Sequence, residues 1–165
     1  MTMTVNEFDY VRSTVRQVPD FPKPGILFLD ITTATKDAKS LNLMIEFLYE
    51  KFKDEKIDYV AGIESRGFIF GTPLACKLGA GFIPIRKPNK LPADTIKESY
   101  SLEYGTDTIE MHADAVKSGD RVLVIDDLLA TGGTAVAACN LVRKAGAEVV
   151  ASACISIVSV PYSKE

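Results

Sequence analysis

The chain has 165 residues, of which 47% are hydrophobic and 25% are charged, and its formal net charge is −3. This composition is typical of a globular protein with one domain, whose core needs no disulfide or metal for stability. Three cysteines without CxxC spacing favour reduced, buried thiols, and a single histidine excludes the usual zinc sets. The slight negative charge excludes a general electrostatic affinity for nucleic acid.

Targeting and membrane signals are missing from the sequence pattern. The first nine residues carry Glu7 and Asp9 and do not read as a signal peptide. The longest apolar tract, residues 149–160, is too short to cross a bilayer and contains three serines. We therefore expect a cytoplasmic protein with neither a membrane nor a nucleic-acid partner.

Hydrophobic periodicity predicts two helices in the first third of the chain. Apolar residues keep roughly helical spacing over residues 5–15, before Pro19. Residues 41–52 carry apolar side chains in the i, i+3, i+4, i+7 pattern of a helix that is buried on one side.

Short apolar runs that alternate with helical stretches predict buried strands. The four runs are residues 59–63, 82–85, 122–125 and 149–158. Strand, helix and strand in succession indicate an α/β fold, with a mostly parallel central sheet that is flanked by helices. Ligands in such folds bind beyond the carboxyl ends of the strands, so we expect the chemistry in the residues that follow positions 63, 85 and 125.

A glycine-rich turn, DDLLATGGT, follows the third apolar run and precedes a helical pattern. Its glycines permit positive φ and close approach of a ligand, and a helix start directs N–H groups with partial positive charge at an anion. The turn lacks the lysine of GxxxxGK[ST] and the order of GxGxxG, so it predicts binding of a sugar monophosphate. The candidate residues for a ribose 5-phosphate are Asp126, Asp127, Ala130, Thr131, Gly132, Gly133 and Thr134.

Two adjacent carboxylates at the end of an apolar strand need partners, because burial of an unpaired ion is unfavourable. Ribose hydroxyls that donate to Asp126 and Asp127, with Mg²⁺ or a water shell nearby, would satisfy them. The alternative is that Asp127 is only a helix N-cap and Asp126 a solvated loop residue.

Residues 122–134, VLVIDDLLATGGT, resemble the phosphoribosyl pyrophosphate motif of the type I phosphoribosyltransferases, and LLATGGT resembles the adenine-specific branch of that family. Four further segments resemble the family in the same order: FPKPGILFLD (21–30), GIESRGFIFG (62–71), IRKPNKLP (85–92) and SYSLEYG (99–105).

The resemblance implies the type I phosphoribosyltransferase fold in a single domain of residues 1–165, with residues 1–35 contributing a small hood that binds the base. It also implies formation of AMP from adenine and phosphoribosyl pyrophosphate in a cytoplasmic homodimer. The cofactor that it implies is Mg²⁺, held mainly by substrate and water, with no direct protein ligand.

The resemblance places pyrophosphate binding at Glu64, Ser65 and Arg66 and at Lys87. The guanidinium of Arg66 can bind phosphate oxygens bidentately and stabilise the leaving group, so we also expect a catalytic contribution from it. The alternatives are a surface ion pair between Arg66 and Glu64 and a solvated charged face at residues 86–90.

The family implies that residues 91–105 form part of a mobile loop that closes over the site and protects an oxocarbenium-like state from water. Glu103 and Tyr104 lie in this segment and are the candidate catalytic residues. By resemblance, Glu103 exchanges a proton at N7 of adenine and Tyr104 covers the reacting groups. From its sequence context alone, Glu103 would be an exposed loop carboxylate.

For the base, the resemblance implies stacking by Phe28 and Leu128 and hydrogen bonds from the backbones of Leu27 and Leu29. Backbone groups that fit an amino-purine would be left unpaired against a 6-oxo purine. The alternative for Leu27 and Phe28 is core packing.

Two other functions stay open from sequence. One is transfer to another purine, namely hypoxanthine, guanine or xanthine. The other is a non-catalytic regulator that senses phosphoribosyl pyrophosphate, because fold alone does not separate these roles.

Overall fold

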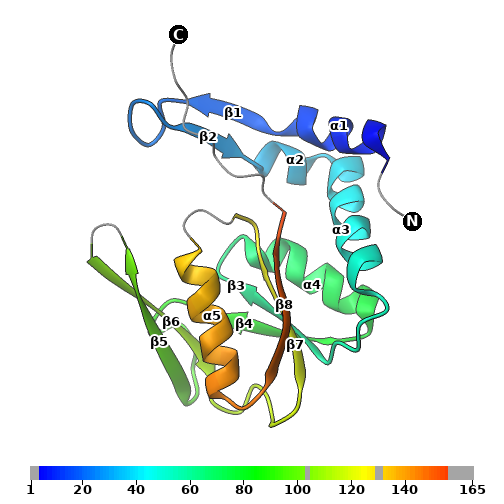
Figure 1. Ribbon diagram of the computed structural model, residues 1–165. Coiled ribbons are helices and arrows are strands. Elements are labelled where there is room, and N and C mark those ends of the chain that lie inside the picture. Colours follow the sequence, from blue (N-terminus) through cyan, green and yellow to red (C-terminus); the bar gives the residue numbers. More distant parts are fainter. Residues whose placement is uncertain (1–3, 103–104, 129–131, 156–165) are drawn as a thin grey trace. The chain divides into compact units, whose positions relative to one another are not determined.

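A computed structural model describes residues 4–102, 105–128 and 132–155 of the chain. The chain divides into two compact units (Figure 1). Within the described part, the first unit comprises residues 4–51 and the second comprises residues 52–155.

The first unit consists of helices and one small hairpin. Its elements are α1 (Val5–Thr14), β1 (Arg16–Pro19), β2 (Leu27–Asp30), α2 (Thr32–Lys36) and α3 (Ala38–Phe52). A capping box begins α1, where Thr4 and Glu7 exchange hydrogen bonds. The two predicted helices are confirmed as α1 and α3. The antiparallel pairing of β1 with β2 was not predicted.

The second unit contains the predicted parallel sheet. Its strands are β3 (Tyr59–Ile63), β4 (Gly81–Ile85), β7 (Arg121–Asp126) and β8 (Glu148–Cys154). They pair in parallel in the order β4-β3-β7-β8. Side chains of β3 and β7 are almost fully buried, which explains their continuous apolar sequence. The α/β fold with a parallel central sheet is therefore confirmed.

Helices α4 (Gly67–Leu78) and α5 (Gly133–Lys144) cover the two faces of this sheet (Figure 1). The connection β3-α4-β4 runs toward one edge and β7-α5-β8 runs toward the other. Crossovers between parallel strands are right-handed as a rule, and two that run in opposite directions place their helices on opposite faces.

Glycines allow α4 to start directly against the sheet. A Cβ atom on Gly67 would lie 2.6 Å from the carbonyl oxygen of Ile125, and one on Gly62 would lie 2.7 Å from the ring of Phe82. Larger residues would push α4 outward. The close approach therefore holds the turn before α4 beside the carboxyl end of β7.

A second hairpin lies between β4 and β7 in the chain. Its strands, β5 (Thr95–Leu102) and β6 (Gly105–His112), pair antiparallel along their full length. Residues 91–105 were expected to form part of a mobile loop, and residues 95–102 of that segment form strand β5 instead. Ile109 and Met111 of β6 are buried, and this packing against the core explains the strand pair.

Strand β4 is an outer strand of the sheet in the described part of the chain. Pro84 lies within β4 opposite Gly62 and carries no N–H group. At the end of β4, the backbones of Arg86 and Glu110 bond to each other in both directions, at 2.9 and 2.7 Å.

The cysteines differ in exposure. The expectation of buried thiols holds for Cys139 and is wrong for Cys76, which lies on the exposed side of α4. The apolar side of that helix is formed by Phe70, Leu74 and Ala75. Burial raises the pKa of the Cys139 thiol.

None of the helices in the described ranges is both long and apolar enough to span a lipid bilayer.

Candidate active site

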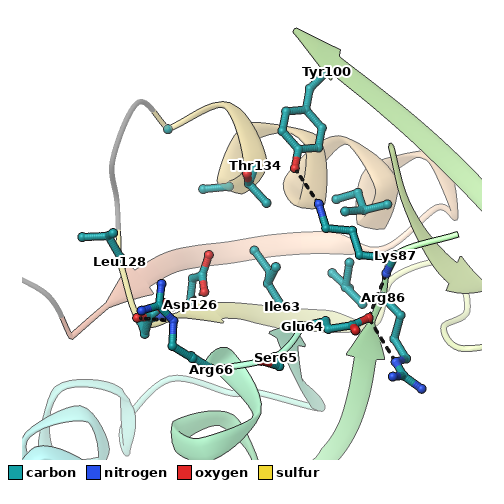
Figure 2. Close-up of a pocket in the computed structure, with 15 residues that line it drawn as sticks. Ile63, Glu64, Ser65, Arg66, Arg86, Lys87, Tyr100, Asp126, Leu128 and Thr134 are labelled. Carbon is teal, nitrogen blue, oxygen red and sulfur yellow. Dashed lines mark hydrogen bonds and ion pairs between the residues drawn. The ribbon is translucent and has the colours of Figure 1, made fainter. Parts of the chain in front are cut away.

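A cavity of about 240 Å³ opens at the carboxyl ends of β3, β4 and β7, where sequence analysis expected the chemistry (Figure 2). Nine of the predicted site residues line it: Glu64, Ser65, Arg66, Lys87, Asp126, Asp127, Leu128, Gly132 and Thr134. The apolar part of the cavity wall includes Ile63, Ile85 and Ile109. The three predicted segments, which are far apart in sequence, therefore meet at one site together with the β5-β6 hairpin.

The remaining predicted residues fall outside this cavity or outside the described structure. Gly133 is the first residue of α5. Leu27, Phe28 and Leu29 belong to β2 in the first unit. There the rings of Phe21 and Phe28 pack edge to face, with 5.2 Å between the ring centroids. Glu103, Tyr104, Ala130 and Thr131 lie outside the described residues.

The two acids at the end of β7 have different environments. Asp127 is only 4% exposed, and its Oδ2 lies 3.0 Å from Nε of Arg66. Its backbone N–H donates to Oδ1 of Asp126 at 2.8 Å. Burial, together with the neighbouring charge of Asp127, raises the pKa of Asp126 to about 7. Asp126 is therefore poised to gain a hydrogen-bond donor or a cation.

The alternative roles for this pair, a helix N-cap for Asp127 and a solvated loop position for Asp126, are both wrong. The N-cap of α5 is Gly132, five residues beyond Asp127, so Asp127 does not cap that helix. Asp126 is the last residue of β7 and is partly buried. Arg66 pairs with Asp127, which also excludes the simple surface pair of Arg66 with Glu64.

Gly132 has the positive φ that the glycine-rich turn requires. Its φ of 82° is left-handed, and α5 starts at the next residue. Gly132 and Thr134 line the cavity, so the amino end of a 12-residue helix faces it. Unpaired N–H groups at such an end favour an anion.

Glu64 binds cations of the segment that follows β4. Its Oε2 accepts hydrogen bonds from Nε of Arg86 at 3.2 Å and from the backbone N–H of Lys87 at 2.9 Å. Its Oε1 accepts one from Nζ of Lys90 at 2.7 Å. Although burial acts in the opposite direction, these hydrogen bonds lower the pKa of Glu64 to about 2. The peptide bond between Glu64 and Ser65 is cis.

Lys87 reaches from the end of β4 toward the β5-β6 hairpin (Figure 2). Its Nζ forms an ion pair with Asp107 and lies 3.5 Å from the hydroxyl of Tyr100. The Tyr100 hydroxyl donates to Oδ2 of Asp107 at 3.0 Å. Against the effect of burial, the hydrogen bond to Asp107 raises the pKa of Lys87.

Sequence reasoning missed Tyr100 and Asp107. The two residues lie opposite each other in the hairpin register, so they become neighbours only when β5 and β6 pair. The available signal was the alternation of polar and apolar residues on both sides of Gly105, which is typical of a hairpin.

The geometry suits an anionic sugar ligand. Arg66 and Lys87 supply cationic donors, the start of α5 supplies backbone donors, and the acids of β7 can accept hydrogen bonds from hydroxyl groups. Within the described ranges, no group of three or more His, Cys, Asp or Glu side chains is arranged to hold a metal ion.

Comparison with family models and curated proteins agrees with this geometry. Residues 31–160 match the model of the phosphoribosyl transferase domain. A protein of Klebsiella pneumoniae (strain 342) named adenine phosphoribosyltransferase is 54% identical over 149 residues, which cover 90% of this chain and 81% of the relative. A protein of the same name from Cronobacter sakazakii is 53% identical over 155 residues, which cover 94% of this chain and 85% of that relative.

Solved structures with the same fold carry the same name. The adenine phosphoribosyltransferase of Rhodothermus marinus superimposes with a TM-score of 0.85 at 54% identity, covering 92% of this chain and 86% of that one. The Saccharomyces cerevisiae enzyme, solved with adenine and an imino-altritol bisphosphate, superimposes with a TM-score of 0.82 at 38% identity, covering 91% of this chain and 90% of that one.

Proposed function

The chain belongs to the adenine phosphoribosyltransferase family, whose members act in purine salvage, and from this premise we propose how its residues carry the reaction. The enzyme transfers the phosphoribosyl group of phosphoribosyl pyrophosphate to adenine and releases AMP and pyrophosphate. The observation that supports our assignment of roles is the single cavity in which the acids of β7, the start of α5, Arg66 and Lys87 meet.

The ribose 5-phosphate binds at the glycine-rich turn. Ala130, Thr131, Gly132, Gly133 and Thr134 hold its phosphate through backbone N–H and hydroxyl groups. The positive φ of Gly132 and its place at the cavity support this role.

The sugar hydroxyls donate to Asp126 and Asp127. Carboxylates of this kind also fit the second shell of Mg²⁺, which prefers oxygen ligands and retains waters. We propose that the ion is held mainly by substrate and water, where it neutralises charge on the diphosphate.

The pyrophosphate binds between Ser65, Arg66 and Lys87. Nε of Arg66 is held by Asp127, and a guanidinium has further N–H groups that can donate to the departing phosphate oxygens. Glu64 acts on this subsite indirectly, because its carboxylate holds the basic segment that carries Lys87. Direct contact between Glu64 and the anion would bring like charges together.

Adenine stacks on Phe28 and Leu128 and is read by the backbones of Leu27 and Leu29. Residues two apart in a strand direct their N–H and C=O groups to the same edge, which supports joint action of Leu27 and Leu29. Glu103 exchanges the proton at N7, and Tyr104 covers the reacting groups.

We propose one catalytic domain over residues 1–165, with residues 1–35 as the hood over the base, in a cytoplasmic homodimer. Its partners are the two small-molecule substrates, without nucleic acid or membrane.

The test is an assay with Mg²⁺, phosphoribosyl pyrophosphate and, separately, adenine, hypoxanthine and guanine, repeated with EDTA. We expect AMP from adenine and its loss with EDTA. Nucleotide formed mainly from hypoxanthine or guanine would favour transfer to another purine. Binding of phosphoribosyl pyrophosphate without product from any base would favour a sensing regulator.

The role of Glu103 has its own variant. Glu103→Gln should lower kcat about 10²- to 10⁴-fold while binding of phosphoribosyl pyrophosphate stays near that of wild type. Turnover at the wild-type rate would refute a proton-transfer role.

A further inference from the structure

Asp107 on the β5-β6 hairpin holds the cation that faces the pyrophosphate subsite. The ammonium of Lys87 has three N–H donors. Among the described residues, Asp107 accepts one of them and the hydroxyl of Tyr100 another, which leaves one donor for the cavity that Lys87 itself lines. Asp107 does not line the cavity and can act on a bound anion only through the lining side chains that it contacts, Lys87 and Tyr100.

Asp107 is itself fixed by bonds that do not involve Lys87. Its Oδ1 accepts from the backbone N–H of Thr108 at 2.8 Å, and its Oδ2 accepts from the hydroxyl of Tyr100 at 3.0 Å. The carboxylate is therefore a fixed anchor, whereas the lysine side chain has a flexible stem of four carbons.

The hairpin that carries this anchor is attached to the rest of the second unit near its base. Nζ of Lys144 on α5 donates to Oε2 of Glu98 at 2.9 Å and to the carbonyl oxygen of Lys97 at 3.1 Å. Within the hairpin, Nζ of Lys97 on β5 lies 2.9 Å from the buried carboxylate of its cross-strand partner Glu110 on β6. These contacts fix the strand positions from which Tyr100 and Asp107 extend.

We propose that Asp107, with Tyr100, is a positioning residue for pyrophosphate binding, which orders the Lys87 ammonium on the cavity wall before the anion arrives. The inference rests on the proposed function, in which Lys87 binds pyrophosphate. Ordering a lysine in advance removes an entropic cost from binding. The negative charge of Asp107 acts against the anion, so its position and its charge have opposite effects.

Two variants separate these effects. Asp107→Ala removes both anchor and charge, and we expect the Kd for inorganic pyrophosphate with Mg²⁺, measured by calorimetry, to rise roughly tenfold. Asp107→Asn keeps an oxygen acceptor and removes the charge, so its Kd should equal or fall below that of wild type. In turnover, Asp107→Ala should raise KM for phosphoribosyl pyrophosphate and leave KM for adenine unchanged.

A double-mutant cycle shows whether Asp107 acts through Lys87. In a Lys87→Met background, Asp107→Ala should no longer change the Kd, whereas a general effect on the hairpin would persist. Ser99→Ala, which removes an exposed side-chain hydrogen bond to Thr108 across the same strand pair and away from the cavity, serves as the matched control and should bind pyrophosphate as wild type does.

Several results would overturn the inference. Tighter binding by Asp107→Ala would make Asp107 a competitor of the anion, and an unchanged effect in the Lys87→Met background would make its role structural. If Lys87→Met alone left the Kd unchanged, the pyrophosphate role of Lys87 would fail together with the inference. Formation of AMP from adenine would still support the proposed transfer in that case.

Discussion

Replacing Asp126 by Asn should stabilise the folded protein at alkaline pH. The wild-type carboxyl group has a pKa of about 7, raised from 3.8 by burial and by the adjacent charge of Asp127. Between about pH 4 and pH 7 the folded protein therefore holds a proton that the unfolded chain has released. The free energy of unfolding therefore falls as the pH rises through that window, and above it the folded chain carries Asp126 ionised and partly buried.

The size of the effect follows from the two pKa values. At 1.36 kcal/mol for each pKa unit, the difference corresponds to about 4 kcal/mol as an upper bound. The side chain of Asp126 keeps contact with solvent, and screening reduces the expected gain to about 2 kcal/mol at pH 8. An Asn side chain can still accept the 2.8 Å hydrogen bond from the backbone of Asp127 through its amide oxygen.

The assay is urea unfolding of wild type and Asp126→Asn at pH 5 and pH 8. The free energy of unfolding of the variant should clearly exceed that of wild type at pH 8. The excess should be much smaller at pH 5, where wild-type Asp126 is protonated in the folded state. Turnover should fall in the same variant, because a carboxylate that accepts from the sugar is lost. Equal stability differences at both pH values, or a variant that is less stable at pH 8, would refute the reasoning.

Two further substitutions test how the site is held. Glu64→Gln should lower the free energy of unfolding at pH 7 by about 1 to 2 kcal/mol, since the lowered pKa is worth about 3 kcal/mol before screening by solvent. The difference from wild type should shrink as the pH falls from about 4.5 toward 2, and urea titrations that show a constant difference would contradict the ion-pair account. Gly67→Ala should destabilise by about 1 to 3 kcal/mol, because its Cβ would meet a backbone carbonyl that cannot rotate away. Unchanged unfolding of Gly67→Ala would show that α4 can shift freely.

The central sheet could be predicted from sequence because its strands are buried on both faces. Continuous apolar runs such as residues 59–63 and 122–125 have no other simple explanation between helical segments, and both are strands with nearly the predicted bounds. The hairpins were not predicted. Strand β5 has mixed polar and apolar residues, and its partner β6 is recognisable mainly through pairing across Gly105.

In the candidate site, too, some features could be predicted from the sequence and others could not. Motifs that are continuous in sequence, at residues 64–66 and at the end of β7, could be recognised directly because the chain itself holds their members together, and their described members Glu64, Arg66 and Asp127 line the cavity. Contacts between motifs were not predictable, because they depend on how the strands are ordered. The pairing of Arg66 with Asp127 joins the ends of β3 and β7, and the pairing of Lys87 with Asp107 joins β4 to the second hairpin.

Pro84 has a consequence for how the folded chain behaves in a crowded solution. An outer strand presents a row of backbone groups that can recruit a strand of another molecule. In β4, one donor of that row is absent at Pro84, and the backbone of Arg86 is already paired with Glu110. This side of the sheet is thereby a poor template for intermolecular growth, which protects against aggregation without any charged side chain within β4.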